Sequence, residues 1–135
     1  MKSIADVIRT DTHLNTLSRG ILAADMTEEL SGAGPFTIFA PSDPAFRKLA
    51  PGLFPALLKP ENKLQLTDLL NHHVIHGKTR FKDLKDGQKL KTINGKELNV
   101  TVKDNAVSIN GANIQMKDME GRNGVVHSLD TVIES

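Results

Sequence analysis

The spacing of the apolar residues changes near residue 77, and this change constrains the fold more than any other feature of the sequence. Before it, apolar residues recur every three or four positions, as they do on one face of a helix. After it, they alternate with polar residues and are interrupted by Asn-Gly and Asp-Gly pairs, which are typical of tight turns between strands. The sequence therefore predicts a helical first half followed by strands.

The first helices are indicated by capping residues. Ser3 can accept the backbone N–H of Asp6, as in a capping box, so a short helix is expected to follow it. A second helix, starting at Asp11 or Thr12, is expected to bury four apolar side chains: Leu14, Leu17, Ile21 and Leu22. The acidic residues after Thr27 are typical of another first turn, because they favour the positive end of a helix dipole.

Residues 36–40 are a short apolar run bounded by prolines, which predicts a buried central strand. Pro41 ends it. Ser42 or Asp43 can cap a helix that carries Phe46 into the core. One more helix is expected from about residue 61 to residue 71.

The last third of the chain is predicted to be strands joined by tight turns, ending in a strand over residues 125–133. We therefore expect an α+β fold, in which a helical N-terminal half packs on a mostly antiparallel β sandwich or wedge, with the strand 36–40 inserted from the first half. The length of 135 residues suits one domain, residues 1–135.

Composition argues against several function classes. The 17 Lys and Arg against 16 Asp and Glu leave +1, and Trp and Tyr are absent, so nucleic-acid binding is not expected. The lack of Cys excludes disulfides, thiolate zinc sites and Cys nucleophiles. No apolar run reaches the roughly 18 residues of a membrane span. Residues 1–15 carry charges instead of the apolar stretch of a secretion signal, so the chain either stays in the cytoplasm or has lost its leader.

Three separated segments carry a resemblance to a known family. Residues 36–46 read FTIFAPSDPAF, residues 69–74 read LLNHHV, and residues 123–133 read NGVVHSLDTVI. In order and spacing they resemble the strand-to-helix motif, the Tyr-His segment and the closing Asn-Gly-x-x-His motif of the fasciclin domain family. His72 stands where the Tyr of the second motif would be.

This resemblance implies a secreted or cell-surface adhesion module, without catalytic residues, metal or cofactor, that binds a cell-surface or matrix protein or an acidic glycan. It implies an extracellular, cell-surface or periplasmic location, and a monomer is expected. The alternative is a small envelope-associated ligand-binding or structural domain. In some animal members an Asp-Ile pair and the Tyr-His segment are reported to contact integrins. By position these correspond to Asp118 with Met119, and to His72.

The histidines of the second motif have two interpretations. Two imidazoles four residues apart on a helix, His72 and His76, can chelate zinc, which would suit a metal-dependent hydrolase using His72, His73 and His76. The Glu that such motifs place between them is missing, and Val74 and Ile75 favour a strand. The structural interpretation is that His73 lies inside the protein and donates a hydrogen bond.

The other motif residues are also expected to be structural. We expect Asp43 to be a buried or half-buried acceptor near His73 or the amides that follow it, and Ser42 to cap a helix and not to be a nucleophile, because the Gly-x-Ser-x-Gly elbow is missing. We expect Asn123-Gly124 to be a turn that needs positive φ, and His127 to be a hydrogen-bonded histidine. The predicted structural set is Asp43, Phe46, His73, Asn123, Gly124, His127 and Asp130.

Charge is distributed unevenly along the chain. Residues 78–96 contain seven basic and two acidic residues, a local charge of +5, whereas residues 97–135 carry −3. Such a basic stripe can hold an acidic polysaccharide or a phospholipid headgroup, with Lys85, Lys89 and Lys91 as the candidate contacts. The alternative is that lysines at hairpin edges stay solvated and prevent sheets from pairing with neighbours.

Overall fold

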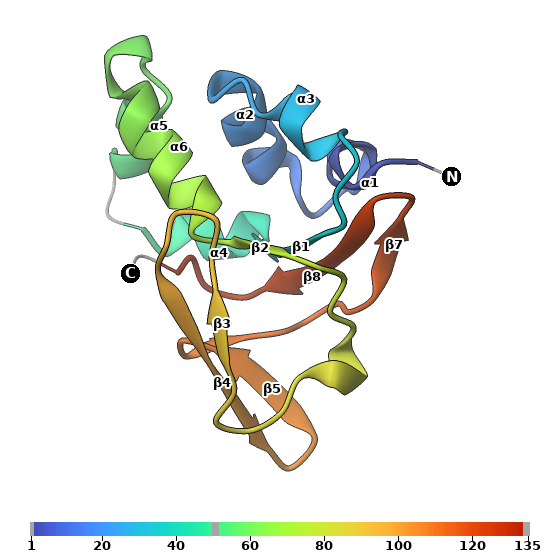
Figure 1. The fold of residues 1–135 in the computed structure, drawn as a ribbon. Helices are drawn as coiled ribbons and strands as arrows, with labels where there is room; N and C mark the ends of the chain where they lie inside the picture. The colour runs from blue at the N-terminus through green and yellow to red at the C-terminus, as the bar shows by residue number, and fades with distance from the viewer. Residues whose placement is uncertain (1, 50–51, 134–135) are drawn as a thin grey trace.

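The computed structural model describes residues 2–49 and 52–133, and its helices and strands form separate layers. Figure 1 shows the helices on one side, a first sheet beneath them and a second sheet beyond the first. This arrangement confirms the α+β class. The helices are α1 (Ile4–Thr10), α2 (Asn15–Ala23), α3 (Thr27–Leu30), α4 (Asp43–Arg47), α5 (Leu53–Leu57) and α6 (Lys63–Asn71), with the 3₁₀ turns η1 (Pro60–Asn62) and η2 (Phe81–Asp83).

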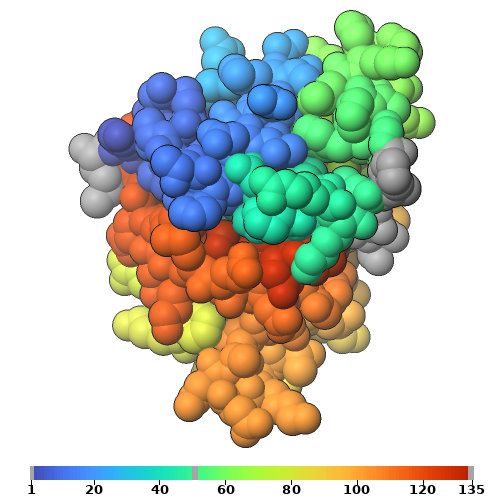
Figure 2. Space-filling model, turned by 180° about the vertical axis from the view of Figure 1, so that it is seen from behind, coloured from blue at the N-terminus to red at the C-terminus, as the bar shows by residue number. Residues whose placement is uncertain are grey.

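Each sheet has four strands. The first has the order β2-β1-β8-β7, formed by β2 (Val74–His76), β1 (Phe36–Pro41), β8 (Gly124–Leu129) and β7 (Met119–Gly121). The second has the order β3-β4-β5-β6, formed by β3 (Lys89–Lys91), β4 (Glu97–Lys103), β5 (Ala106–Ile109) and β6 (Ala112–Asn113). Seen from behind in Figure 2, the blue and green helical half covers the red and orange strands, and the second sheet extends away from the helices.

The two central strands, β1 and β8, come from opposite ends of the chain and run parallel. Their register begins with Phe36 beside Gly124 and ends with Pro41 beside Leu129, whereas the other strand pairs are antiparallel. All the residues of both strands are buried, as expected for strands covered on both faces. The expected insertion of residues 36–40 into a mostly antiparallel structure is confirmed. The parallel direction of β1 relative to β8 was not predicted.

Alternate side chains of the central strands enter two different cores. On β1, Ile38 and Ala40 face the helices and join Ile4, Leu14, Leu66 and other residues of the first core. Phe39 points the other way and packs between the two sheets with Leu98, Ile109 and Leu129. The first sheet therefore connects the helical layer to the second sheet.

Three local predictions need correction. Helix α2 starts at Asn15 and not at Asp11 or Thr12. Leu22 is 59% exposed although it was expected to be buried, because Leu17 and Ile21, one turn apart, face the core and the next position points away. The last strand ends at Leu129 instead of residue 133, although the segment that follows it still buries Val132 and Ile133.

Asn123 connects the end of the chain to the helical layer. Its buried side chain accepts the Ile4 N–H at 2.9 Å and donates to the carbonyls of Leu30 and Gly32, both at 2.8 Å. Its own carbonyl accepts the Phe36 N–H at 2.9 Å. The Asn123 side chain thus bonds to the first turn of α1 and the end of α3, and its backbone carbonyl bonds to the entry of β1.

The prediction that Asn123-Gly124 needs positive φ is wrong. Neither residue has positive φ. Glycine is required at position 124 because the neighbouring backbone approaches it closely. A Cβ on Gly124 would lie 2.0 Å from the carbonyl oxygen of Phe36, a backbone atom that cannot move aside without breaking the strand pair. The backbone of β1 therefore excludes any side chain at position 124.

We expect Asn123→Ala to lower the free energy of unfolding by about 3 to 5 kcal/mol, because it removes two buried hydrogen bonds and one partly buried hydrogen bond and leaves their partners unpaired. Urea unfolding at pH 7 measures this. The matched control is Asn99→Ala on β4, where the side chain is exposed, and it should change stability by less than about 0.5 kcal/mol. A loss below about 1 kcal/mol for Asn123→Ala would contradict the role of this side chain.

Candidate functional site

The three histidines of the second motif occupy three different environments. His72 follows the end of α6 and lines one hollow, His73 is sealed in the core, and His76 at the end of β2 lines a second hollow. Over residues 2–49 and 52–133 there is no group of three or more His, Cys, Asp or Glu that could hold a metal ion. His72, His73 and His76 therefore do not share the site that a metal-dependent hydrolase needs.

His73 is a buried histidine with both ring nitrogens in use. Nδ1 lies 2.8 Å from the carbonyl oxygen of Leu69, and Nε2 accepts the Ile133 N–H at 2.9 Å. Because Nε2 must accept, Nδ1 carries the proton and donates, which fixes the neutral tautomer. Burial lowers the pKa of His73 to about 4. This ring joins α6 to the segment that follows β8.

His127 makes the equivalent connection on β8. Its Nε2 lies 2.8 Å from the Thr79 carbonyl oxygen, and its Nδ1 accepts the Asp118 N–H at 3.1 Å, so Nε2 carries the proton. The ring stacks on Phe39 with centroids 5.8 Å apart. Burial lowers the pKa of His127 as well. The geometry is that of a neutral histidine which holds the loop after β2 to the segment before β7.

His72 differs from these two histidines. Its side chain is also buried, with 4% of the residue exposed, yet neither ring nitrogen has a hydrogen-bond partner among the described residues. Burial lowers the pKa of His72, and the charge of Lys96 lowers it further, whereas the nearby Asn94 side chain and the charge of Asp68 act in the opposite direction. An unpaired buried polar group costs roughly 1 to 3 kcal/mol of stability. His72 therefore carries a cost that no hydrogen bond within the described residues offsets.

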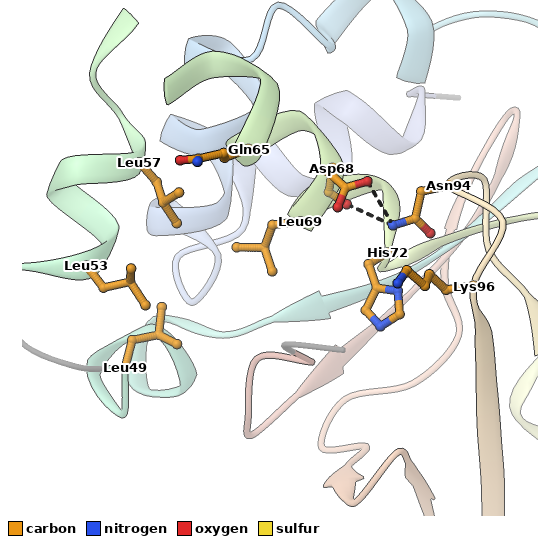
Figure 3. A pocket seen from close by; sticks show the side chains of 9 residues that line it. All are labelled: Leu49, Leu53, Leu57, Gln65, Asp68, Leu69, His72, Asn94 and Lys96. Atoms are coloured by element: carbon orange, nitrogen blue, oxygen red, sulfur yellow. Dashed lines mark hydrogen bonds between the residues drawn. The ribbon is translucent and has the colours of Figure 1, made fainter. Parts of the chain in front are cut away.

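The hollow beside His72 has an apolar side and a polar side, as Figure 3 shows. Its volume is about 280 Å³. The apolar side is made of Leu49, which follows α4, and of leucines from α5 and α6. The polar side is made of residues from α6, of His72 just after it, and of residues from the β3–β4 turn. The lining residues are Leu49, Leu53, Leu57, Gln65, Asp68, Leu69, His72, Asn94 and Lys96.

Two of the polar residues in this hollow are already bonded to each other. The Asn94 amide donates to the carbonyl oxygen of Asp68 at 3.2 Å and to its carboxylate at 3.3 Å, and the Asn94 carbonyl accepts the Thr92 hydroxyl. Lys96 is exposed and forms no ion pair within the described residues. The polar groups of this hollow that lack a hydrogen bond or ion pair to the described residues therefore include the His72 ring nitrogens, which are buried, and the Lys96 ammonium, which is exposed.

The second hollow lies between the outer edges of β2 and β3 and has a volume of about 710 Å³. Lys89 and Lys91 line it from β3, and His76 lines it from β2. Lys85, the third lysine predicted from the basic stripe, is exposed but does not line it. We call this second hollow, defined by Lys89, Lys91 and His76, the basic groove.

Asp118 and Met119 lie away from both hollows. Asp118 is exposed, and its carboxylate accepts the Phe81 N–H at 2.9 Å. Met119 begins β7 and is partly buried against the helical core. The Asp-Ile position and the Tyr-His position of the family motifs, taken here by Asp118 with Met119 and by His72, therefore do not form one continuous pocket.

Asp43 has a different partner from the one predicted. Its half-buried carboxylate accepts the Thr16 N–H at 2.7 Å, at the start of α2, and it is not bonded to His73. The backbone N–H of Asp43 donates to the His13 carbonyl at 2.9 Å. Asp43 thus caps a neighbouring helix instead of its own, because the turn after β1 lies against the first turn of α2.

Phe46 and Asp130 complete the predicted structural set. Phe46 packs on Phe54 with ring centroids 4.7 Å apart, which joins α4 to α5. The Asp130 carboxylate accepts the Asn113 N–H at 2.9 Å and its side-chain amide at 3.1 Å, so it holds β6 beside the end of β8. Both residues contact protein segments and line neither hollow.

The helical layer on two four-stranded sheets, held by the buried histidines His73 and His127, defines a class of α+β domain. Comparison with known proteins identifies this class. The family model described as Fasciclin domain matches residues 12–135, and the chain belongs to the fasciclin domain family. It is 38% identical to Protein sll1483 of Synechocystis sp. (strain ATCC 27184 / PCC 6803 / Kazusa), a match that covers 97% of this chain and 72% of that protein. It is 32% identical to the uncharacterized protein sll1735 of the same organism, covering 98% of each.

More distant relatives are animal proteins. The chain is 33% identical to the transforming growth factor-beta-induced protein ig-h3 of Oryctolagus cuniculus, over 98% of this chain and 19% of that protein. Its fold is similar to that of a FAS1 domain pair from the insect cell adhesion molecule Fasciclin I, with a TM-score of 0.88, 18% identity, and coverage of 99% of this chain and 51% of that one. This structural match confirms the fold predicted from the three motifs.

No helix within the described residues has both the length and the apolar character needed to cross a membrane.

We expect the protein to lose stability in mild acid because His73 is buried and neutral. The unfolded chain binds a proton with a pKa near 6.5 and the folded chain only with a pKa of about 4, so the stabilisation is complete above 6.5 and is lost as the pH falls toward 4. His73 alone should lower the free energy of unfolding by about 2 kcal/mol between pH 7 and pH 5, as measured by urea unfolding.

The control is His13→Gln, which should keep the same pH dependence because the side chain of His13 is 70% exposed. NMR titration of the His73 ring protons in the folded protein gives an independent test. A His73 pKa at or above 6.5 would show that the proposed cause is wrong.

We expect His72→Phe to raise the free energy of unfolding by about 1 to 3 kcal/mol, because phenylalanine keeps the ring and removes the two unpaired nitrogens. The matched variant is His73→Phe, which should lower it because the Ile133 N–H loses its acceptor. Thermal and urea unfolding of both variants at pH 7 make the comparison, and a destabilised His72→Phe would rule out an unpaired ring in the folded protein.

Proposed function

We propose that this fasciclin domain, acting as one unit over residues 1–135, is a non-enzymatic adhesion module that works outside the cytoplasm and binds an acidic glycan or an acidic protein surface. Family membership and the fold shared with a domain pair of an insect cell adhesion molecule support adhesion. The basic groove supports an acidic partner and is the observation on which this proposal depends.

The charge of the basic groove is not neutralised by its neighbours. Lys89 and Lys91 are both exposed and flank the buried Leu90, so both side chains point to the same side of β3. None of the residues that line the groove is acidic. By contrast, Lys78 and Arg80 both pair with Glu120, at 2.9 and 2.7 Å. Within the described residues, Lys89 and Lys91 have no ion pair, so both of their charges remain available in the groove.

The shape of the groove also suits an extended partner. It runs between two strand edges that meet at only one bridge, Ile75 with Thr92. The aliphatic stems of the lysines and the exposed ring of His76 offer flat contact surfaces, while the ammonium groups remain free for sulfate or carboxylate groups. A sulfated or uronic-acid polysaccharide has charges at regular spacing along an extended chain, which matches this arrangement.

We expect the protein to bind heparin in low-salt buffer and to release it as ionic strength rises, because the interaction is between exposed charges. The double variant Lys89→Glu, Lys91→Glu should weaken binding by at least about tenfold, since it replaces two attractive charges with two repulsive ones. Retention on a heparin column and isothermal titration measure the change.

The control for this experiment is Lys59→Glu with Lys103→Glu, which changes the net charge by the same amount at two exposed lysines outside the groove. This control should retain most of its heparin affinity. Equal losses in the two double variants would show that net charge and not the groove determines binding, and a wild-type protein that fails to bind at low salt would overturn the proposal.

The hollow beside His72 favours a second function, that of a small envelope-associated ligand-binding domain. Its leucine side and its unpaired imidazole are features of a small-molecule pocket, in which an apolar lining carries a few polar groups. The two functions use different surfaces and are compatible in one domain.

A further inference from the structure

We propose that the hollow beside His72 is a binding site for a small aliphatic carboxylate. The hydrocarbon chain of the ligand lies against the leucines, and its carboxylate is held by the Lys96 ammonium and the ring N–H of His72. This site is separate from the basic groove, and the inference does not rest on the proposed adhesive function.

The size and lining of the hollow set the size of the ligand. At about 280 Å³ the hollow lies at the small end of the range of ligand pockets, so it suits a short ligand. Octanoate has a short hydrocarbon chain, and its end would lie beside Leu53, a lining residue that is 38% exposed. The apolar side seen in Figure 3 gives this chain four leucine contacts: Leu49, Leu53, Leu57 and Leu69.

The unpaired imidazole of His72 is the reason to expect a polar head group on the ligand. Buried polar side chains normally have hydrogen-bond partners, as His73 and His127 do in this same protein. His72 lines the hollow, and only 4% of the residue is exposed. Its ring nitrogens have no hydrogen-bond partner within residues 2–49 and 52–133. A ligand oxygen would satisfy the ring N–H.

The charges around the imidazole favour an anion. The Asp68 carboxylate on α6 keeps its negative charge but already accepts the Asn94 amide. Lys96 on the β3–β4 turn forms no ion pair within the described part of the chain, and the neighbouring His73 is neutral and faces the core. A carboxylate would pair with Lys96 and make a charge-assisted hydrogen bond with His72. An ammonium head group would be repelled by Lys96.

A bound carboxylate would also oppose the lowering of the His72 pKa that burial causes. In the free protein, burial and Lys96 keep the pKa of His72 below its usual value. A ligand carboxylate beside the ring favours the protonated form, so binding takes up a proton and becomes tighter as the pH is lowered toward the pKa of the free ring. Asp68 acts in the same direction as the ligand, and Lys96 acts against it.

The experiment is a titration of the ¹⁵N-labelled protein with sodium octanoate, followed by NMR and by isothermal titration. We expect saturable one-to-one binding, with shifts centred on Leu53, Leu69, His72 and Asn94, and a rise in the pKa of His72. Octan-1-ol and octylammonium should each bind at least about tenfold more weakly, the effect of losing one charge-assisted bond. No saturable octanoate binding, or equal binding of the three ligands, would overturn the inference.

Two variants test the head-group contacts, and one serves as their control. Lys96→Gln should weaken octanoate binding by about tenfold, whereas Lys89→Gln, the same change outside this hollow, should leave it unaltered. His72→Phe should weaken binding and remove its pH dependence while raising the thermal midpoint of the free protein. That rise shows that the variant is folded, so weak binding cannot be attributed to unfolding.

Wild-type affinity for octanoate in both Lys96→Gln and His72→Phe would overturn the inference. The heparin experiment remains independent of this result. Replacing Lys89 and Lys91 with Glu should weaken heparin retention and leave octanoate binding intact, so failure of one proposal is distinguishable from failure of the other.

Discussion

The parallel pairing of β1 with β8 is the constraint on which the rest of the structure depends. It places a strand from the first third of the chain beside the last strand, with both strands buried. Because β1 sends alternate side chains into both cores, the helical layer and the second sheet are each positioned by the same pair. Gly124 permits the close contact with Phe36, and the amide of Asn123 then fixes α1 and α3 above it.

The buried histidines add connections that the sheet alone does not provide. A neutral imidazole has one donor and one acceptor, and both His73 and His127 use the two nitrogens to join backbone segments distant in sequence. In each case burial disfavours the charged form, which is consistent with a structural role at neutral pH. His72 has the same chemistry and the same burial without the bonds, and this contrast within one chain is why we assign it to binding instead of architecture.

Much of the fold could be predicted from sequence because its signals are local. The change of apolar spacing near residue 77 predicted the helical and stranded halves, and the motif around residues 36–46 predicted the inserted strand. The direction of β1 relative to β8 could not be predicted, since a fully buried strand shows no alternation that records its neighbours. The exposure of Leu22 was missed because periodicity alone does not show how wide the buried face of a helix is.

The sites were less predictable for a related reason. The segments that form them are brought together only by the tertiary fold, so spacing within one segment says little. The leucines at positions 49, 53 and 57 follow a helical spacing that could have been recognised, but nothing in the sequence places Asn94 and Lys96 opposite them. The partner of Asp43 was missed likewise, because Thr16 lies on another helix.

The parallel central pair also has a consequence for biosynthesis. On the ribosome, β1 emerges long before β8, and at typical elongation rates several seconds separate them. During that interval the helical half has no completed sheet to cover, and the edge of β1 that β8 will occupy is open to other extended chains. Sealing of both cores must therefore wait until residues 124–129 have been translated and have left the ribosome.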